Sequence, residues 1–516
     1  MSISIFEIIG PTMIGPSSSH TAGMARIGLM AHSIINAEPV HITLTLHPAI
    51  RYTYKGHRAD VALIGGFLGI REDDDRIRDA LKISANKGIT HSIDFWKDSS
   101  INPNTVQISV KTTLGSEHNV QGISVGGGSI LITQIDGFKV HLTGREHVIV
   151  VWSELNIASE IEKIFGTKVE SYIDGSKHLY TIKLNKSSND NILKRILHLN
   201  GVTKLHTINP VLNYGYGKDD IDYYKSYKEL LNVSELQNKS IAEIAVSYEI
   251  CRSGKSKEDI YSQMENQLKV MSEACRYGLE DDIKLNFGLT SGKDGKIMYR
   301  YLQQENTLSG TTISMAIAYA LATMEVNGSM GCVVAAPTAG SCGIVPGCFL
   351  SLKKQRGISN DIIIDAMFVA AIIGVIMYNR GASFSGVVGG CQSEIGVSSA
   401  IAAAGLVHLC GGNSLQIVQG MAMAIKNLLG LICDPIAGPV EVPCIKRNSV
   451  GVVNAFACAD MALAGIQSYI PPDEVIDALV NTQQLLPPEL KGTAIGGLAC
   501  TCTAKNLRKK ISNGKF

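Results

Sequence analysis

Residues 147–166 read HVIVVWSELNIASEIEKIFG, and they begin the most regular pattern in the chain. HVIVVWS is typical of a strand, and LNIASEIEKIFG is typical of a helix that ends at Gly166. Strand, strand, helix and strand patterns follow as far as residue 208, with Asp174-Gly175 as a hairpin turn signal. The order βαββαβ predicts a ferredoxin-like fold for residues 147–210.

The segments on either side of this pattern differ from it and from each other. Residues 1–142 combine strand-like runs such as VHITLTL (40–46) with an opening helix, which predicts an α+β domain. LNYGYGKDD (212–220) is typical of a linker. Residues 224–516 are rich in Ala, Met and Gly and have almost no strand pattern, so we expect an all-α domain there. The sequence therefore predicts a multidomain protein of α+β, ferredoxin-like and all-α parts.

The composition argues against two classes of partner. The net charge of the 516 residues is +1, which gives no basic surface for nucleic acid or for an acidic membrane. The N-terminus lacks the basic and long apolar regions of a signal peptide. The apolar run AMFVAAIIGVIMY (366–378) is too short to span a bilayer and predicts a buried core helix. We expect a soluble, cytoplasmic protein that binds neither nucleic acid nor membranes.

The twelve cysteines all lie between Cys251 and Cys502. In a reducing compartment, cysteines are either small buried side chains or metal ligands. Cys391, Cys433 and Cys444 stand out because each lies in a loop rich in Gly or Pro. Such loops can wrap an inorganic cluster and donate backbone N–H groups to its sulfurs. Their spacing matches no zinc-ribbon or ferredoxin pattern, so only the loop context singles them out.

Three other loops carry residues suited to chemistry. IGPSSSHTAG (14–23) places hydroxyls and an imidazole before a helix, where they either cap the helix or bind a carboxylate. YKGHRAD (54–60) presents His57 as a general-base candidate, and the flanking Lys55 and Arg58 are expected to disfavour its protonation. SVGGGS (124–129) is either a phosphate-binding loop or a turn.

Together these motifs resemble the iron–sulfur-dependent L-serine dehydratases, which are also called L-serine ammonia-lyases. The resemblance covers nearly the whole chain and includes, in order, GPSSSHTAG, YKGHRADVAL, PNTVQISV with SVGGGS, PTAGSCGIVPG, GGCQSEIGV and CDPIAGPVEVPCIKRN. In that family a β-type domain, an ACT regulatory domain and an α-type domain occur as separate subunits or as one chain. The resemblance implies that residues 1–142, 147–210 and 224–516 are these three domains, fused.

The resemblance also implies a site and a reaction. A 4Fe–4S cluster would be held by Cys391, Cys433 and Cys444, with its fourth iron open as a Lewis acid for the departing β-hydroxide. His57 would remove the α-proton of L-serine, and the products would be pyruvate and ammonia. The residues expected to bind the substrate are Ser17, Ser18, Ser19, His20, Thr21, Thr338 and Ser341. The family further implies amino-acid catabolism, a link to gluconeogenesis, and a homodimer.

Three other functions remain open at this point. One is a pyridoxal-phosphate dehydratase, with SVGGGS around the phosphate and a lysine as Schiff base. A second is an iron–sulfur hydro-lyase that acts on a hydroxy acid, with the same chemistry at iron. A third is a non-catalytic amino-acid sensor that uses the ferredoxin-like domain and holds no cluster. Iron and sulfide analysis separates the first and third from the iron–sulfur enzymes.

Overall fold

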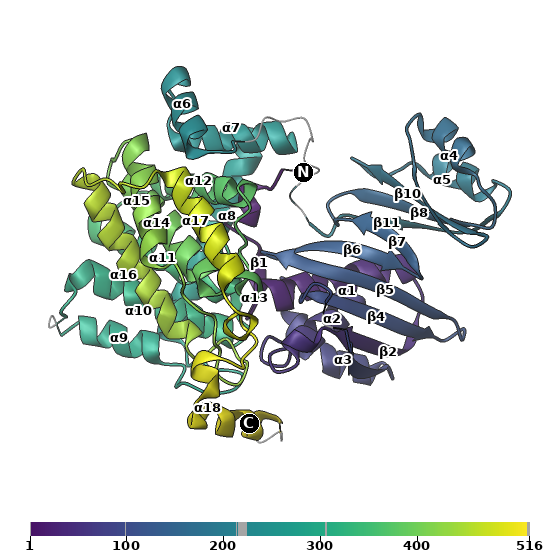
Figure 1. The fold of residues 1–516 in the computed structure, drawn as a ribbon, viewed down its shortest axis with the longest axis horizontal. Coiled ribbons are helices and arrows are strands. Elements are labelled where there is room, and N and C mark those ends of the chain that lie inside the picture. Colours follow the sequence, from purple (N-terminus) through teal and green to yellow (C-terminus); the bar gives the residue numbers. More distant parts are fainter. Residues whose placement is uncertain (1, 99, 213, 215–223, 305–306, 513–516) are drawn as a thin grey trace. The chain divides into compact units, whose positions relative to one another are not determined.

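The computed structural model describes residues 2–98, 100–212, 214, 224–304 and 307–512. The predicted linker at 212–220 lies almost entirely outside these residues. The chain forms two compact units: the first comprises Met1–Ala22, Tyr52–Arg58 and Gly217–Phe516, and the second comprises Gly23–Arg51 and Ala59–Tyr216. Figure 1 shows strands concentrated in the N-terminal half and helices in the C-terminal half. The expected multidomain architecture, with a β-rich N-terminal region and a helical C-terminal part, is confirmed.

The second unit contains a six-stranded sheet in the order β3-β2-β4-β5-β6-β7. The β2–β3 pair is parallel and the other pairs are antiparallel. The strands are β2 (Pro39–Leu46), β3 (Thr90–Phe95), β4 (Thr105–Thr112), β5 (Glu117–Gly126), β6 (Ser129–Ile135) and β7 (Phe138–Leu142), and the helices are α1 (Gly23–Ile35), α2 (Ala59–Phe67) and α3 (Ala80–Asn86). Inward residues of β2 and β4, such as Leu44 and Ile108, are fully buried, as the alternating pattern predicts.

A four-stranded antiparallel sheet follows in the same unit, in the order β11-β8-β10-β9. Its elements are β8 (His147–Ser153), α4 (Ala158–Phe165), β9 (Glu170–Asp174), β10 (Lys177–Leu184), α5 (Asp190–Leu197) and β11 (Val202–Ile208). Their order along the chain is the one the sequence predicts. Apolar side chains from β8, β10 and both helices form one core, among them Val151, Ile161, Tyr180 and Ile196. Gly166 ends α4 in the left-handed conformation, at φ 68°.

Residues 124–129, SVGGGS, form the end of β5, a hairpin turn at Gly127 and Gly128, and the start of β6. The carbonyl oxygen of Gly128 accepts a hydrogen bond of 2.6 Å from Nη1 of Arg26. The guanidinium of Arg26 also pairs with Glu72 at 2.7 Å, and both side chains are almost fully buried. A buried ion pair therefore anchors this turn.

The first unit is mainly helical. Its helices are α6 (Tyr227–Gln237), α7 (Ile241–Ser253), α8 (Lys257–Glu280), α9 (Asp294–Leu302), α10 (Gly310–Gly328), α11 (Ile344–Arg356), α12 (Asn360–Asn379), α13 (Gly386–Gly389), α14 (Ile395–Leu409), α15 (Ser414–Asn427), α16 (Cys444–Leu463), α17 (Pro472–Leu485) and α18 (Cys502–Ser512). Local sequence signals set several boundaries: Ser240 and Glu243 form a capping box at the start of α7. Within the described chain, α12 alone is long and apolar enough to cross a membrane, and 78% of its most apolar window is buried. Such burial is typical of a core helix.

The N-terminal segment of the chain belongs to this helical unit. Strand β1 (Thr12–Ile14) pairs antiparallel with β12 (Cys332–Val334). Glu249 of α7 accepts hydrogen bonds from the hydroxyl of Ser4 at 2.9 Å and from the backbone N–H of Ile5 at 3.1 Å. The same carboxylate pairs with Arg252 at 2.5 Å. The predicted domain 1–142 thus contributes segments to both units, and the division into three functional domains stays a prediction.

We expect Glu72→Gln to destabilise the second unit, because it leaves the buried guanidinium of Arg26 without an opposite charge. Removing one partner of a buried ion pair typically costs about 3–5 kcal/mol in the free energy of unfolding. Urea denaturation followed by circular dichroism measures this change. Glu117→Gln is the matched control, because the Glu117–Lys111 pair is exposed on β5 and β4 and should change the unfolding curve little. Equal effects of the two substitutions would contradict a structural role for the buried pair.

Candidate active site

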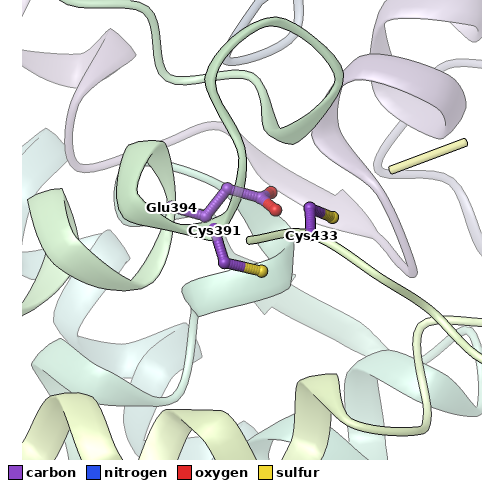
Figure 2. Close-up of side chains that lie close together, drawn as sticks. All are labelled: Cys391, Glu394 and Cys433. Carbon is purple, nitrogen blue, oxygen red and sulfur yellow. The ribbon is translucent and has the colours of Figure 1, made fainter. Parts of the chain in front are cut away.

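The three cysteines singled out by their loops come from three separate segments of the helical unit. Cys391 lies between α13 and α14, Cys433 lies in the loop after α15, and Cys444 is the first residue of α16. The sulfurs of Cys391 and Cys433 and a carboxylate oxygen of Glu394 all lie within 4.8 Å of one another. Figure 2 shows these three side chains side by side, with Cys391 and Glu394 on one segment and Cys433 on another. Cys433, Cys444 and Glu394 also line one cavity.

The backbone around Cys433 leaves room next to its sulfur. A β-carbon added at Gly386 would lie 2.6 Å from Oε2 of Glu394 and 3.3 Å from the sulfur of Cys433. A β-carbon at Gly492 would lie 3.3 Å from the same sulfur. Glycine at these positions therefore makes a cradle of backbone around the thiol. A sulfur-bridged cluster needs such small residues, because they let the backbone of the loop approach the cluster closely.

The electrostatics of the thiols favour a positively charged partner. A hydrogen bond with Cys391 and burial raise the pKa of Cys433 well above its usual value. Burial and the neighbouring charge of Cys391 do the same for the pKa of Cys444. Among the described residues near them, Arg447 brings a guanidinium to 3.6 Å from the sulfur of Cys391, but it also pairs with Asp434 at 2.7 Å. Three thiolates would carry more negative charge than one guanidinium shared with Asp434 can balance. Bound metal ions would supply the additional positive charge. The donor set fits an iron–sulfur group.

Glu394 is a site residue that sequence reasoning missed. Its carboxylate accepts a hydrogen bond of 2.9 Å from the hydroxyl of Thr338. Burial raises the pKa of Glu394 to about 7, and the Thr338 hydrogen bond opposes this shift. A signal was present, because Glu394 follows Cys391 by one helical turn in GGCQSEIGV. The site therefore offers an oxygen donor beside the sulfur donors.

Two imidazoles line the same cavity as Cys433 and Cys444. His20 lies in the π-helical turn Ser18–Ala22, directly before α1, and His57 lies in the turn before α2. Their Nδ1 atoms are 3.0 Å apart, and both side chains are buried. The structure thus brings together two histidines that the sequence had placed in separate loops.

Burial lowers the pKa of His57 well below 6.5, and the positive charge that His20 carries when it is protonated lowers it further. The sequence predicted a neutral imidazole but attributed it to other neighbours. Lys55 is exposed, and Arg58 donates a hydrogen bond to the sulfur of Met330. The low pKa therefore has a different physical cause from the one expected: desolvation and a second imidazole.

The residues expected to bind substrate fall into two groups. Ser17, Ser19 and His20 line the cavity. The others connect the loops around it. The Ser18 hydroxyl accepts a hydrogen bond of 3.0 Å from the Ala339 N–H, the Thr21 hydroxyl donates one of 2.7 Å to the His57 carbonyl, and the Thr338 and Ser341 hydroxyls lie 3.1 Å apart. The residues that do not line the cavity therefore hold its loops in place, and this role does not depend on contact with a substrate.

Ser385 is a second residue that the sequence did not indicate. Its side chain is 1% exposed and lines the cavity. Its hydroxyl has no hydrogen-bond partner within the part of the chain that the structure describes. A buried hydroxyl without a partner is costly, so its presence in a cavity suggests a role with a ligand. No motif precedes it, and only the fold reveals it.

Comparison with known proteins decides the family. The model of the serine dehydratase alpha chain matches residues 236–499. A probable L-serine dehydratase alpha chain from Bacillus subtilis (strain 168) is 44% identical over 291 residues, which are 56% of this chain and 96% of the relative. An L-serine dehydratase from Helicobacter pylori (strain ATCC 700392 / 26695) is 30% identical over 526 aligned residues, 97% of this chain and 98% of the relative. The chain belongs to the serine dehydratase family.

Within this family the chain is of the fused, single-chain type. The Bacillus alpha chain matches little more than half of it, whereas the Helicobacter protein matches almost all of it. The L-serine dehydratase TdcG of Escherichia coli (strain K12) is also similar over its whole length, at 28% identity over 96% of this chain and 98% of the relative. The two histidines of the site lie outside the residues that match the alpha-chain model, and the three cysteines lie inside them.

Proposed function

We propose that this chain is an L-serine ammonia-lyase, which dehydrates and deaminates L-serine to pyruvate and ammonia. The observation that carries this proposal is one cavity lined by His57, Cys433 and Cys444, in a chain that matches L-serine dehydratases over nearly its full length. A proton acceptor and a set of sulfur donors that can hold a Lewis-acidic metal group suit the dehydration of a β-hydroxy amino acid.

We propose that Cys391, Cys433 and Cys444 hold a 4Fe–4S cluster. The donor set and the backbone cradle beside Cys433 support this. When bound, such a cluster with one open iron supplies a Lewis acid for the β-hydroxyl of the substrate, which is otherwise a poor leaving group. Glu394 lies beside the same donors and adds an oxygen atom to the site.

His57 is the proposed base. Its low pKa keeps the imidazole neutral near pH 7, so that one ring nitrogen carries a lone pair. Nδ1 is engaged with Nδ1 of His20, which leaves Nε2 to accept the α-proton. As the Cα–H bond breaks, its electron pair forms the Cα–Cβ double bond and the Cβ–O bond breaks. The resulting enamine tautomerises and hydrolyses in water to pyruvate and ammonia.

The hydroxyls of the cavity are the proposed substrate contacts. Ser17, Ser19 and Ser385 line it, and Ser385 has its hydrogen-bonding capacity available. The substrate carries a carboxylate and an amine, and a serine hydroxyl can donate to the first or accept from the second. Ser385 is the sharpest of the three assignments, because its hydroxyl lacks the competing contacts that the other loop residues make.

We further propose that residues 147–210 are an ACT-type regulatory domain, between a β-type domain at 1–142 and an α-type domain at 224–516. The βαββαβ order and the strand order β11-β8-β10-β9 support this. Sheets of this type associate side by side, so the proposal includes a homodimer formed through this domain. It also includes a cytoplasmic location, where the cysteines stay reduced.

We expect Cys391→Ser, Cys433→Ser and Cys444→Ser each to abolish bound iron and sulfide and, with them, pyruvate formation from L-serine. Each substitution removes a thiolate ligand, and a serine hydroxyl is a poorer ligand for iron than a thiolate is. The measurement is iron and sulfide content of anaerobically purified protein, beside pyruvate release. Cys251→Ser is the matched control, because Cys251 is exposed and far along the chain from the three loops.

Three results would contradict this proposal in different ways. A Cys391→Ser protein with its full iron content would show that Cys391 is not a ligand. Unsubstituted protein without iron or pyruvate release, after anaerobic purification, would favour the amino-acid sensor. Pyruvate formation by protein that contains no iron would indicate that the reaction uses a different cofactor.

We expect His57→Ala to lower the turnover number for L-serine by about 10²–10⁴-fold, the usual contribution of a positioned base. Iron content should stay at the unsubstituted level, because His57 is no cluster ligand in this proposal. Exchange of the α-proton with deuterated solvent measures the step directly. A variant that kept its iron and still exchanged the α-proton at the original rate would rule His57 out as the base.

We expect Ser385→Ala to raise the KM for L-serine by about 10–150-fold, since one hydrogen bond to a charged group contributes roughly 1.5–3 kcal/mol. Stability should stay the same or rise, because the substitution removes a buried hydroxyl that has no hydrogen-bond partner among the described residues. Ser398→Ala is the control with the opposite pattern: its hydroxyl donates to the Ala336 carbonyl at 2.7 Å, so its loss should lower stability and spare KM. A Ser385→Ala protein with normal KM and lowered stability would contradict the role proposed for Ser385.

A further inference from the structure

The two buried imidazoles of the site form a pair. Nδ1 of His20 lies 3.0 Å from Nδ1 of His57. The rings are nearly parallel, with an interplanar angle of 10° and centroids 4.8 Å apart. His20 is 2% exposed and His57 is 8% exposed, and both line the cavity that contains Cys433 and Cys444. The contact is therefore a hydrogen bond between the rings, inside the active site.

A contact of this kind admits one hydrogen atom. If both Nδ1 atoms carried hydrogen the two N–H groups would repel, and if neither did the two lone pairs would repel. In a neutral pair each ring has one N–H, so the ring that donates through Nδ1 has its lone pair on Nε2. The ring that accepts through Nδ1 has its hydrogen on Nε2. The direction of this single hydrogen bond decides which histidine can remove a proton from the substrate with Nε2.

The backbone holds the two rings in this contact. The hydroxyl of Thr21, next to His20, donates to the carbonyl of His57 at 2.7 Å. The N–H of His20 donates to the Ser17 hydroxyl at 3.2 Å, and the N–H of His57 donates to the Thr53 carbonyl at 2.8 Å. Both ring-bearing turns are thus fixed to each other and within themselves. These bonds keep the two backbones close enough for the rings to meet, and the ring contact itself joins the two Nδ1 atoms.

We propose that His20 is a positioning residue, whose Nδ1 accepts the Nδ1 hydrogen of His57 and thereby fixes Nε2 of His57 as the proton acceptor. The inference rests on the assignment of His57 as the base. It replaces the expectation that His20 acts mainly on the substrate. The arrangement has the logic of a catalytic triad, in which a third group selects the tautomer of the base. Here that group is a neutral imidazole in place of a carboxylate.

A neutral acceptor has a consequence that a carboxylate would not have. A carboxylate beside His57 would favour its protonated form, whereas a second imidazole does not. The base therefore stays unprotonated in a buried site before the substrate arrives, which agrees with the lowered pKa of His57. The tautomer is selected without charging the resting pair.

The test uses two variants of nearly the same shape, His20→Asn and His20→Leu. The Asn side-chain oxygen lies close to where Nδ1 of histidine lies and can accept the hydrogen, whereas Leu has no acceptor. Both enzymes are loaded with iron and sulfide anaerobically. The readouts are iron content, the turnover number and KM for L-serine, and the kinetic isotope effect with serine deuterated at Cα.

We expect His20→Leu to lower the turnover number by about 10²–10⁴-fold, because His57 then adopts either tautomer and is less well oriented. KM should change little, and the isotope effect should be at least as large as in the unsubstituted enzyme. His20→Asn should recover activity to within about tenfold of the original. If His20→Leu fails to fold or to load iron, His20→Gln takes its place, since its polar end lies near the Nε2 position instead.

The inference is overturned if Asn and Leu retain equal, near-normal activity. It is equally overturned if both lose activity alike, or if the main effect is a raised KM, which would make His20 a substrate contact. His57→Asn and His57→Leu, measured in parallel, test the underlying assignment and should both be inactive. An active His57→Asn beside an inactive His20→Asn would reverse the roles and so refute His57 as the base. Inactive His57 variants with unaffected His20 variants would refute only the positioning role.

Discussion

The active site depends on one contact between two backbones, that of Gly56 with Gly438. A β-carbon at Gly56 would lie 2.4 Å from the carbonyl carbon of Gly438, and one at Gly438 would lie 2.4 Å from the carbonyl oxygen of Tyr52. Gly438 also has φ 108°, a conformation that other residues rarely adopt. One of these loops carries His57 and the other carries Cys433. Glycine on both sides therefore sets how closely the proposed base approaches the proposed cluster ligands.

The same contact explains how the catalytic unit is assembled from distant parts of the sequence. The residues that match the alpha-chain model, 236–499, contain all three cysteines but neither histidine. His20 and His57 come from Met1–Ala22 and Tyr52–Arg58, which belong to the same compact unit. The pairing of β1 with β12 and the contacts of Glu249 hold the first of these segments in place. The alpha-type sequence thus supplies the sulfur donors, and the N-terminal segments complete the site.

The parts of this arrangement that sequence reasoning predicted have local signals. The strand and helix order of residues 147–208 follows from hydrophobic periodicity and from Gly166 and Gly175 at turns. The three cysteines were distinguished by Gly and Pro in their loops, and His57 by its glycine turn. Each of these signals lies within about ten residues of the feature that it indicates.

Apart from Glu394, which follows Cys391 by one helical turn, the parts that were missed have no local signal. The pairing of His20 with His57 joins turns that are 37 residues apart. Ser385 is notable only because the fold buries its hydroxyl without a hydrogen-bond partner among the described residues. Lys55 and Arg58 surround His57 in sequence, but the groups that lower its pKa are those that surround it in space. Tertiary packing, which periodicity does not encode, decides all three.

Burial has opposite consequences for the two kinds of group on this cavity, and together they account for its chemistry. Desolvation disfavours the charged form of every ionisable group, so it lowers the pKa of His57 and raises that of Cys444. The pKa of Cys433 is raised by its hydrogen bond with Cys391 and, in the same direction, by desolvation. For a base, the result is a lone pair that is available near neutral pH. For the thiols, the result is a strong preference for a metal over bare thiolates, because metal binding replaces the proton. A single desolvated cavity therefore keeps the proposed base unprotonated and favours a cationic group at its thiols. The positioning role proposed for His20 fits the same constraint, since a neutral imidazole would orient His57 without adding a charge that the cavity would have to bury.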